Sequence, residues 1–282
     1  MNELILDDFL TSALKEDIGC GDVTTDSLIC PSRQSECGLY AKEEGVLAGM
    51  EVAARVFHLL DAGILFHAER TDGNTVSPGD RIAGIRGNTR AILKGERVAL
   101  NILQRMSGIA TKTHRMCELV REYPARITDT RKTLPGFRML DKYAVTVGGG
   151  SNHRMNLSDL VLIKDNHIAA VGSIAEAMAL AREKAPFPVK VEVEVENQRQ
   201  LAEAIRAGAD IVMLDNMGCD EMSKAVAFAD HRVILEASGN VEESRIVAIA
   251  ATGVDYISCG ALTHSVRALD ISLKFDADEL TK

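Results

Sequence analysis

The chain has 282 residues, of which 46% are hydrophobic and 26% charged, and its formal net charge is −9 at pH 7. That length suits one α/β barrel or two domains of modest size. The acidic balance, with four tyrosines and no tryptophan, argues against a nucleic-acid-binding surface. No apolar run approaches the length of a membrane span, and the chain starts with acidic residues rather than a signal peptide. We therefore expect a cytoplasmic protein that binds neither nucleic acid nor membrane.

Cysteine and histidine spacing gives no sign of a metal centre held by side chains alone. None of the six cysteines forms a C-x-x-C pair, so reduced thiols are the simpler interpretation; they are Cys20, Cys30, Cys37, Cys117, Cys219 and Cys259. Neither H-x-x-x-H nor H-E-x-x-H occurs. The chain also lacks G-x-G-x-x-G and G-x-x-x-x-G-K-S/T, so neither a dinucleotide-binding fold nor a P-loop is predicted.

The first hundred residues have a mixed pattern. Residues 3–16 are predicted to form a helix, and the GDVTT segment at 21–25 is typical of a turn, with Asp22 or a threonine as a cap. Short alternating strands rich in turn signals surround a predicted helix at 51–63. This pattern indicates an α+β block.

A strong amphipathic helix is predicted over 89–106, with Leu93, Leu100 and Leu103 at helical spacing. Ser107 and Gly108 interrupt the pattern, and a second helix is predicted over 109–122. Arg97 lies on the margin of the apolar stripe, which leaves two interpretations. The simpler one is an arginine that pairs with Glu96 or another acid, and the other is a cation presented across an interface.

After Pro124 the rhythm changes to short β-rich runs, the later ones separated by helical segments. The runs are 125–130, 159–165, 189–195, 209–215, 232–238 and 254–260, and the last four recur about every 22 residues. Alternation of this kind predicts parallel βαβ units with right-handed crossovers. Six strands are fewer than the eight of a complete barrel, so we expect a partial barrel or an open parallel sheet.

Polar residues follow these strands at the ends where parallel α/β folds bind ligands. Cations come early, acids in the middle and small residues late. The candidates are Thr130, Arg131, Lys132, Lys164, Glu194, Asp215, Ser238, Gly239, Asn240, Gly260 and Ala261. Residues 126–167 hold seven Lys or Arg and four Asp, a local charge of +3 in an acidic chain. They also contain three consecutive glycines at 148–150, with His153 and Arg154 shortly after. The stretch predicts a site for a small, highly anionic ligand.

Two further patterns support a site at these strand ends. Along 189–196 valines alternate with Lys190, Glu192, Glu194 and Glu196. An edge strand with one wet face is the simpler interpretation, but in a barrel the acids face inward, where they need cations, metal or ligand hydroxyls. Glycines near 239 and 260, each before a predicted helix, would let main-chain N–H groups approach a phosphate.

Long motifs along nearly the whole chain resemble the quinolinate phosphoribosyltransferase family. They are EDIGCGDVTTD, ERVALNILQRMSGIAT, DTRKTLPGFRMLDKYAV, GGGSNHRMNLSDLVLIKDNH, EVEVEN, MLDN, EASGN and TGVDYISCGALTHS. A ModD-type relative shares the scaffold, but NHRMNLSD and LIKDNH are more similar to the quinolinate enzymes. Val98 stands where that family often has Thr, and Cys259 precedes the phosphate-loop glycine.

The resemblance implies an N-terminal α/β sandwich domain over 1–108, joined by the tail 268–282, and a partial α/β barrel of about six parallel strands over 109–267. It implies transfer of phosphoribose from phosphoribosyl pyrophosphate (PRPP) to quinolinate with decarboxylation. The products are nicotinate mononucleotide, pyrophosphate and carbon dioxide, in NAD biosynthesis. It also implies Mg²⁺ and a homodimer, or a larger assembly built from it.

Residue roles follow from the same resemblance. Arg131, Lys132, His153, Arg154 and Lys164, with Thr130 beside them, match the acceptor side of the family's site, and Arg97 matches an arginine that reaches the site from the neighbouring subunit. Glu194 and Asp215 match the acids near the ribose hydroxyls and Mg²⁺, and are candidate catalytic residues together with Lys132. Ser238, Gly239, Asn240, Gly260 and Ala261 match the loops that hold the 5′-phosphate. The proton donor after decarboxylation stays open between Lys132 and water.

Three alternatives remain from the sequence alone. The chain could be a ModD-like transferase, a nicotinate phosphoribosyltransferase with a different acceptor, or a catalytically silent phosphate-binding barrel. Intact cations, acids and phosphate loops disfavour the silent barrel.

Overall fold

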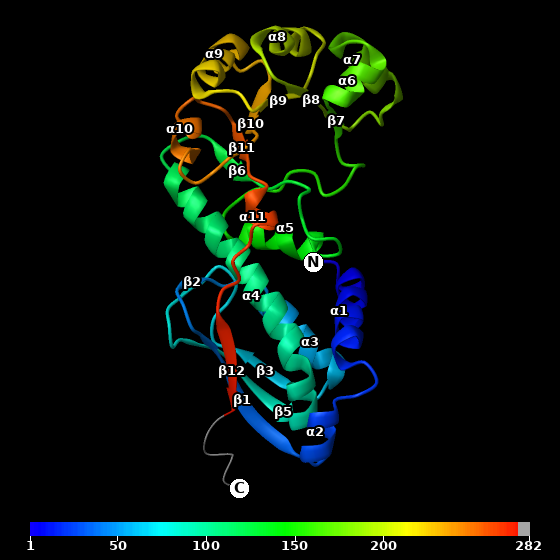
Figure 1. Ribbon diagram of the computed structural model, residues 1–282, viewed down its shortest axis with the longest axis vertical. Helices are drawn as coiled ribbons and strands as arrows, with labels where there is room; N and C mark the ends of the chain where they lie inside the picture. The colour runs from blue at the N-terminus through cyan, green and yellow to red at the C-terminus, as the bar shows by residue number, and fades with distance from the viewer. Residues whose placement is uncertain (276–282) are drawn as a thin grey trace. The chain divides into compact units, whose positions relative to one another are not determined.

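The computed structural model describes residues 1–275, which form two compact units (Figure 1). The N-terminal unit comprises residues 1–112, residues 135–148 and the described residues from Val266 on. The C-terminal unit comprises residues 113–134 and 149–265. Within residues 1–275, no helix combines the length and the apolar character that crossing a membrane requires.

The N-terminal unit is built on a four-stranded antiparallel sheet in the order β12-β1-β5-β3. The strands are β1 (Gln34–Ala41), β3 (Leu65–Ala68), β5 (Arg81–Asn88) and β12 (Ile271–Phe275), and a separate pair joins β2 (Gly45–Val46) to β4 (Thr75–Val76). Because β12 pairs with β1, residues 271–275 lie in the sheet of the N-terminal unit. Residues 276–282 of the tail lie outside the described residues.

Helices complete this unit: α1 (Glu3–Ile18), α2 (Val23–Leu28), α3 (Met50–Leu60), α4 (Thr89–Val120) and α5 (Arg138–Val147). Asp7 on α1 pairs with Arg55 on α3 at 2.6 Å. Leu10, Phe57 and Ile92 are buried, one from each of α1, α3 and α4. The result is the expected α/β arrangement of sheet and helices around one apolar core.

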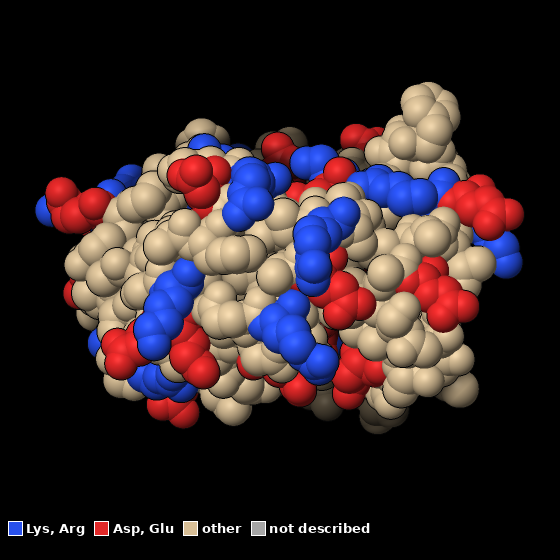
Figure 2. Space-filling model, turned by 90° about the horizontal axis from the view of Figure 1, so that it is seen from above, with Lys and Arg blue, Asp and Glu red and all other residues tan. Residues whose placement is uncertain are grey.

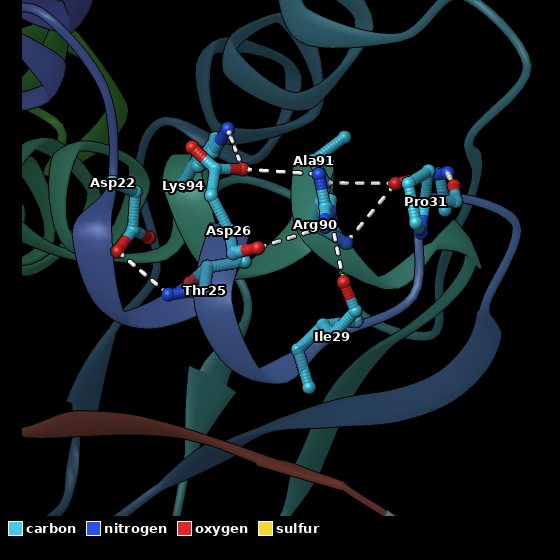
Figure 3. A network of polar contacts seen from close by, with 9 residues as sticks. Asp22, Thr25, Asp26, Ile29, Pro31, Arg90, Ala91 and Lys94 are labelled. Atoms are coloured by element: carbon cyan, nitrogen blue, oxygen red, sulfur yellow. Dashed lines mark hydrogen bonds and ion pairs between the residues drawn. The ribbon is translucent and has the colours of Figure 1, made fainter.

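The GDVTT segment forms the short helix α2 rather than a turn. Asp22 is its N-cap, because its carboxylate accepts a hydrogen bond from the Thr25 N–H at 2.9 Å. Figure 3 shows how two cations of α4 hold α2: Arg90 donates to the Ile29 carbonyl at 2.7 Å, and Lys94 pairs with Asp26 at 2.8 Å. This network fixes the start of α4.

The predicted interruption of the long helix at Ser107 and Gly108 is wrong, because α4 runs unbroken through both residues. The two small residues serve close packing instead. The Ser107 hydroxyl accepts a hydrogen bond from the Ala48 N–H at 3.1 Å. A Cβ on Gly108 would lie 2.2 Å from the Arg267 carbonyl oxygen, so only glycine allows that approach.

Residues 135–148 belong to the N-terminal unit, whereas the expected division places them with the barrel. Asp141 of α5 is buried and accepts two hydrogen bonds from Arg105, at 2.9 and 2.8 Å. The Tyr143 hydroxyl donates to Asp72 at 2.8 Å. These buried polar contacts tie α5 to the N-terminal unit, although sequence order sets it between two strands of the other sheet.

The C-terminal unit contains one sheet of six parallel strands in the order β6-β11-β10-β9-β8-β7. The strands are β6 (Arg126–Thr128), β7 (Val161–Ile163), β8 (Val191–Val195), β9 (Ile211–Asp215), β10 (Ile234–Ser238) and β11 (Tyr256–Ser258). The edge strands β6 and β7 do not pair with each other, so the sheet is an unclosed barrel. The expectation of a partial barrel of six parallel strands is confirmed.

Helices follow the strands of this sheet: α6 (Asp165–Val171), α7 (Ile174–Lys184), α8 (Gln198–Arg206), α9 (Cys219–Ala229), α10 (Ile246–Ala250) and α11 (Ala261–His264). Figure 1 shows α7, α8 and α9 on the outer side of the strands. Val191, Val193 and Val195 are buried, and Glu192 between them is buried too. Among the residues of β8 only Glu194 is partly exposed, and β8 pairs on both sides, so it is not an edge strand with one solvated face.

The predicted helix starting directly after Asn240 is wrong, because α10 begins only at Ile246. Residues 241–242 have no regular structure, and residues 243–245 form a turn. The main chain at Gly239 and Asn240 therefore cannot take its anion affinity from an adjoining helix start.

Positive charge is not concentrated on the outer surface of this end of the chain. Figure 2 looks from above onto the end that carries α7, α8 and α9 in Figure 1. Lys and Arg side chains lie there among Asp and Glu, with no broad field of one sign.

Candidate active site

The strand ends of the C-terminal unit surround a cavity of about 560 Å³. That volume suits ligands of ordinary metabolite size. The predicted site residues that line it are Thr130, Arg131, Lys132, His153, Arg154, Lys164, Glu194, Asp215, Ser238, Gly239 and Asn240. Three predicted residues, Arg97, Gly260 and Ala261, are not among the lining residues.

The cations gather because residues 151–154 are attached to the free edge of β6. Ser151 donates its N–H to the Ile127 carbonyl at 2.8 Å, and its own carbonyl accepts from Asp129 at 3.2 Å. The Asp129 carboxylate is buried and accepts the His153 N–H at 2.9 Å. His153 and Arg154 are thereby brought beside Arg131 and Lys132, although more than twenty positions separate the two pairs in the sequence.

Arg131 and Arg154 are close enough to repel each other. The pKa of Arg154 is lowered, first by burial and second by the charge of Arg131, while Glu192 and Asp159 act in the opposite direction. An anion that bridges the two guanidinium groups would relieve this repulsion further. The arrangement suits a ligand with more than one carboxylate, because each guanidinium can bind a carboxylate through two hydrogen bonds.

Lys132 is held through its backbone. Its N–H donates to the Thr130 hydroxyl at 3.0 Å, and its carbonyl accepts from the Thr263 hydroxyl at 2.9 Å. A Cβ on Gly260 would lie 2.8 Å from Cδ of Lys132. Gly260 thus gives room to the lysine stem, a different task from lining the cavity.

The acids lie on the central strands. Glu194 at the end of β8 forms an ion pair with Lys164, which follows β7. Asp215 ends β9 and accepts a hydrogen bond from the Asn216 side-chain amide at 2.7 Å. Glu194 is therefore neutralised by a cation that a bound carboxylate could take over.

The loop after β10 has an unusual backbone. Gly239 has φ of +90° and Asn240 of +47°, and Asn216 across from them has φ of +54°. A Cβ on Gly239 would lie 2.2 Å from the Asn216 side-chain oxygen and 2.8 Å from its backbone nitrogen. Glycine is required both for the conformation and for the close approach of these two loops.

Arg97 lies in the N-terminal unit, where its side chain is exposed on α4. The pKa of the neighbouring Glu96 is raised by burial, and the charge of Arg97 opposes that rise only in part. Because the Arg97 side chain is accessible, it can still be a cation presented to another molecule.

Two buried acids were not selected from the sequence. Glu236 on β10 lines the cavity, and burial followed by the charge of Glu192 raises its pKa to about 7. Glu192 on β8 lies beside it in the interior. The alternation in VKVEVEVEN pointed Glu192 inward, whereas a lone Glu in an apolar strand gave no signal for Glu236.

Mg²⁺ has a plausible but incomplete set of protein ligands at Glu194 and Asp215. Neither acid belongs to a group of three or more metal-binding side chains among residues 1–275. Each already has a side-chain partner. Mg²⁺ is usually held by one or two carboxylates together with phosphate oxygens and water. The two acids fit an ion that arrives with a diphosphate, and they do not form a metal cage of their own.

Comparison with protein families gives two matches that together span most of the chain. Residues 22–107 match the model of the quinolinate phosphoribosyl transferase N-terminal domain, and residues 109–274 match that of the C-terminal domain.

Whole-chain relatives agree. The chain is 45% identical over 273 residues to a probable nicotinate-nucleotide pyrophosphorylase [carboxylating] of Bacillus subtilis, covering 97% of this chain and 94% of that protein. It is 43% identical to quinolinate phosphoribosyltransferase [decarboxylating] 1 of Nicotiana glauca, covering 94% and 81%. The crystal structure of NadC from Streptococcus pyogenes superposes with a TM-score of 0.94 at 44% identity, covering 98% and 99%.

Proposed function

The chain belongs to the quinolinate phosphoribosyltransferase family, and from this premise we propose that it transfers phosphoribose from PRPP to quinolinate in NAD biosynthesis. Carbon dioxide is lost, and the other products are nicotinate mononucleotide and pyrophosphate. The observation that supports this reaction is one cavity with cations along one side and acids with a glycine loop along the other.

The cationic side is the acceptor half of the site. Arg131 and Arg154 take the two carboxylates of quinolinate, and Lys132 and Lys164 add positive charge at single points. When a carboxylate binds Lys164, the ion pair with Glu194 opens. Binding of the acceptor thereby frees Glu194 to act on the second substrate.

The other side is the donor half. Ser238, Gly239 and Asn240 hold the 5′-phosphate, with support from Gly260 and Ala261. As the bond from ribose to pyrophosphate breaks, positive charge develops on the ribose, and Glu194 and Asp215 stabilise it. Glu194 and Asp215 would hold Mg²⁺ together with diphosphate oxygens, and the ion would supply neutralisation of the leaving group.

Decarboxylation follows from the new charge on the pyridine nitrogen. Once that nitrogen is ribosylated, the adjacent ring carbon can carry the electron pair left when carbon dioxide departs. A proton then binds to that carbon and forms a C–H bond with this pair. Lys132 and a water molecule are both candidates for the proton donor. The protein's part at this stage is to hold the ring and exclude bulk water.

An assay with PRPP, Mg²⁺ and either quinolinate or nicotinate tests this function. We expect carbon dioxide and nicotinate mononucleotide to form in equal amounts from quinolinate, with little turnover of nicotinate. Turnover of nicotinate without turnover of quinolinate would contradict the proposal. Omission of Mg²⁺ should abolish turnover if the ion neutralises the leaving pyrophosphate.

A further inference from the structure

A cluster of one histidine and two acids lies beneath the acceptor half of the cavity. His153 Nε2 is 3.3 Å from a carboxylate oxygen of Glu192 and 3.4 Å from one of Glu236. Both acids are buried, and no role in phosphoribosyl transfer falls to them directly. Their positions, on β8 and β10, place the cluster inside the curved sheet.

The hydrogen bonds argue against a metal ion in this cluster. Arg154 donates its backbone N–H to His153 Nδ1 at 2.7 Å, so Nδ1 must keep its lone pair. The proton of the neutral ring then sits on Nε2, the nitrogen that faces the two acids. A metal would need the lone pair of that nitrogen. The Nε2–H of His153 therefore faces the two carboxylates as a close electrostatic contact.

The two acids are costly for the fold. Neither oxygen of Glu192 has a hydrogen-bond partner of normal geometry within residues 1–275, and one oxygen of Glu236 also lacks one. Buried carboxylates without full compensation destabilise a protein, and a leucine or glutamine of similar volume would avoid the penalty. Stability alone does not explain an acid at 192.

What Glu192 does have is one cationic neighbour, Arg154, and one imidazole in close contact, that of His153. Its charge attracts Arg154, which Arg131 repels. Glu192 also contacts the His153 ring, and Nδ1 of that ring accepts the Arg154 N–H. The Arg154 guanidinium is further held by the Leu160 carbonyl at 3.1 Å. Glu192 thus acts on both the backbone and the charge of the residue that has to meet the acceptor.

We propose that Glu192 is a positioning residue of the acceptor half-site, which acts through His153 and Arg154 to keep Arg154 directed toward Arg131 before the dianionic acceptor binds. This inference rests on the proposed function, because it takes quinolinate as the ligand of the two arginines. It predicts a selective effect on the acceptor, since His153 and Arg154, the partners of Glu192, both belong to the acceptor half.

Three variants test the inference. Glu192→Leu removes the charge and both polar oxygens, and Glu192→Gln keeps a polar oxygen facing His153 Nε2–H but loses the charge. Glu196→Gln is the matched control, because Glu196 comes directly after β8 and is exposed. Steady-state KM for quinolinate and for PRPP, kcat and thermal midpoint are measured for each.

We expect Glu192→Leu to raise the quinolinate KM by about tenfold or more, while the PRPP KM changes less than about twofold. Its thermal midpoint should stay equal or rise, since a buried unpaired carboxylate is gone. Glu192→Gln should recover part of the quinolinate KM, and Glu196→Gln should match the wild type.

Other outcomes overturn the inference. A purely structural role predicts a lower thermal midpoint with both KM values or kcat affected together. An unchanged or lower quinolinate KM in Glu192→Leu would mean that the acid merely repels the acceptor or does nothing. If Glu192→Leu does not fold, Glu192→Gln replaces it as the test. An unchanged quinolinate KM in Glu192→Gln, at equal or higher stability, would then overturn the inference. Failure of the wild type to use quinolinate would instead count against the proposed function.

Discussion

Arg154 combines burial, a cationic neighbour and a fixed backbone, which makes its effect on the acceptor specific. Arg154→Ala should raise the quinolinate KM by about 10- to 100-fold, because a charge-assisted hydrogen bond of roughly 1.5–3 kcal/mol is lost. The PRPP KM should change little. Arg154→Lys is the control that keeps the charge without the fork, and an intermediate KM is expected. Equal effects of Arg154→Ala on both substrates would refute the assignment.

Glu236 gives a pH signature in stability. Its pKa in the folded protein, about 7, lies above the ordinary value of 4.5. Between these values the folded state holds a proton that the unfolded state has lost, so the free energy of unfolding falls as pH rises through this window. The decrease in the free energy of unfolding has not begun below about pH 4.5, and it is complete above about pH 7.

The size of this loss is about 3 kcal/mol for a group so deeply buried. Urea unfolding of the wild type and of Glu236→Gln at about pH 5 and about pH 8 measures it. The variant should show a smaller difference in unfolding free energy between the two pH values. Identical pH dependence in both proteins would show that Glu236 does not hold the extra proton.

At the scale of elements, the loop after β10 tests the donor half. Gly239→Ala places a Cβ against Asn216, including its backbone nitrogen at 2.8 Å, so one loop must move. We expect the PRPP KM to rise by about tenfold or more, since phosphate contacts of the main chain depend on this loop. The quinolinate KM should change much less.

Gly208→Ala is the matched control. Gly208 also has positive φ, +80°, but a Cβ there meets nothing within 4 Å. Its substitution should cost about 1 kcal/mol of stability from backbone strain and leave both KM values unchanged. If the two variants behave alike, strain rather than loop contact explains the loss in Gly239→Ala.

Much of the C-terminal sheet was predictable because each strand is a short apolar run, and the last four recur at a regular interval. A polar residue at the end of each such strand could be assigned to one edge from topology alone. That residues 135–148 belong to the N-terminal unit could not be predicted. Asp141 and Tyr143 show no sequence pattern that reveals Arg105 and Asp72 as their partners. The helix interruption predicted at Ser107 and Gly108 failed for a similar reason, because both residues make their contacts with residues far away in sequence.

At the scale of the whole molecule, the exposed Arg97 bears on assembly. If Arg97 completes the site of a neighbouring subunit in a homodimer, Arg97→Ala and Lys132→Ala should each be inactive alone. In a heterodimer of the two, one site regains both residues. Random mixing then restores about a quarter of the wild-type activity, because half the dimers are mixed and each has one intact site.

Activity of verified heterodimers, purified with two different tags, measures this recovery, and for them about half of the wild-type activity is expected because each has one intact site of two. A mixture of Arg97→Ala with wild-type subunits serves as the reference for exchange. Absence of recovery in confirmed heterodimers would place Arg97 outside the neighbouring site.

The open edge of the barrel makes the acceptor half of the site differ from the donor half in local stability. Acceptor residues follow or flank β6 and β7, the two edge strands, each only three residues long. Donor residues end β8, β9 and β10, which have paired neighbours on both sides. A sheet opens locally from its edges, so amide hydrogens around residues 126–132 and 151–164 should exchange with solvent faster than those of 191–195, 211–215 and 234–238. The acceptor half would then be assembled largely by its own ligand, on a donor half that is already rigid.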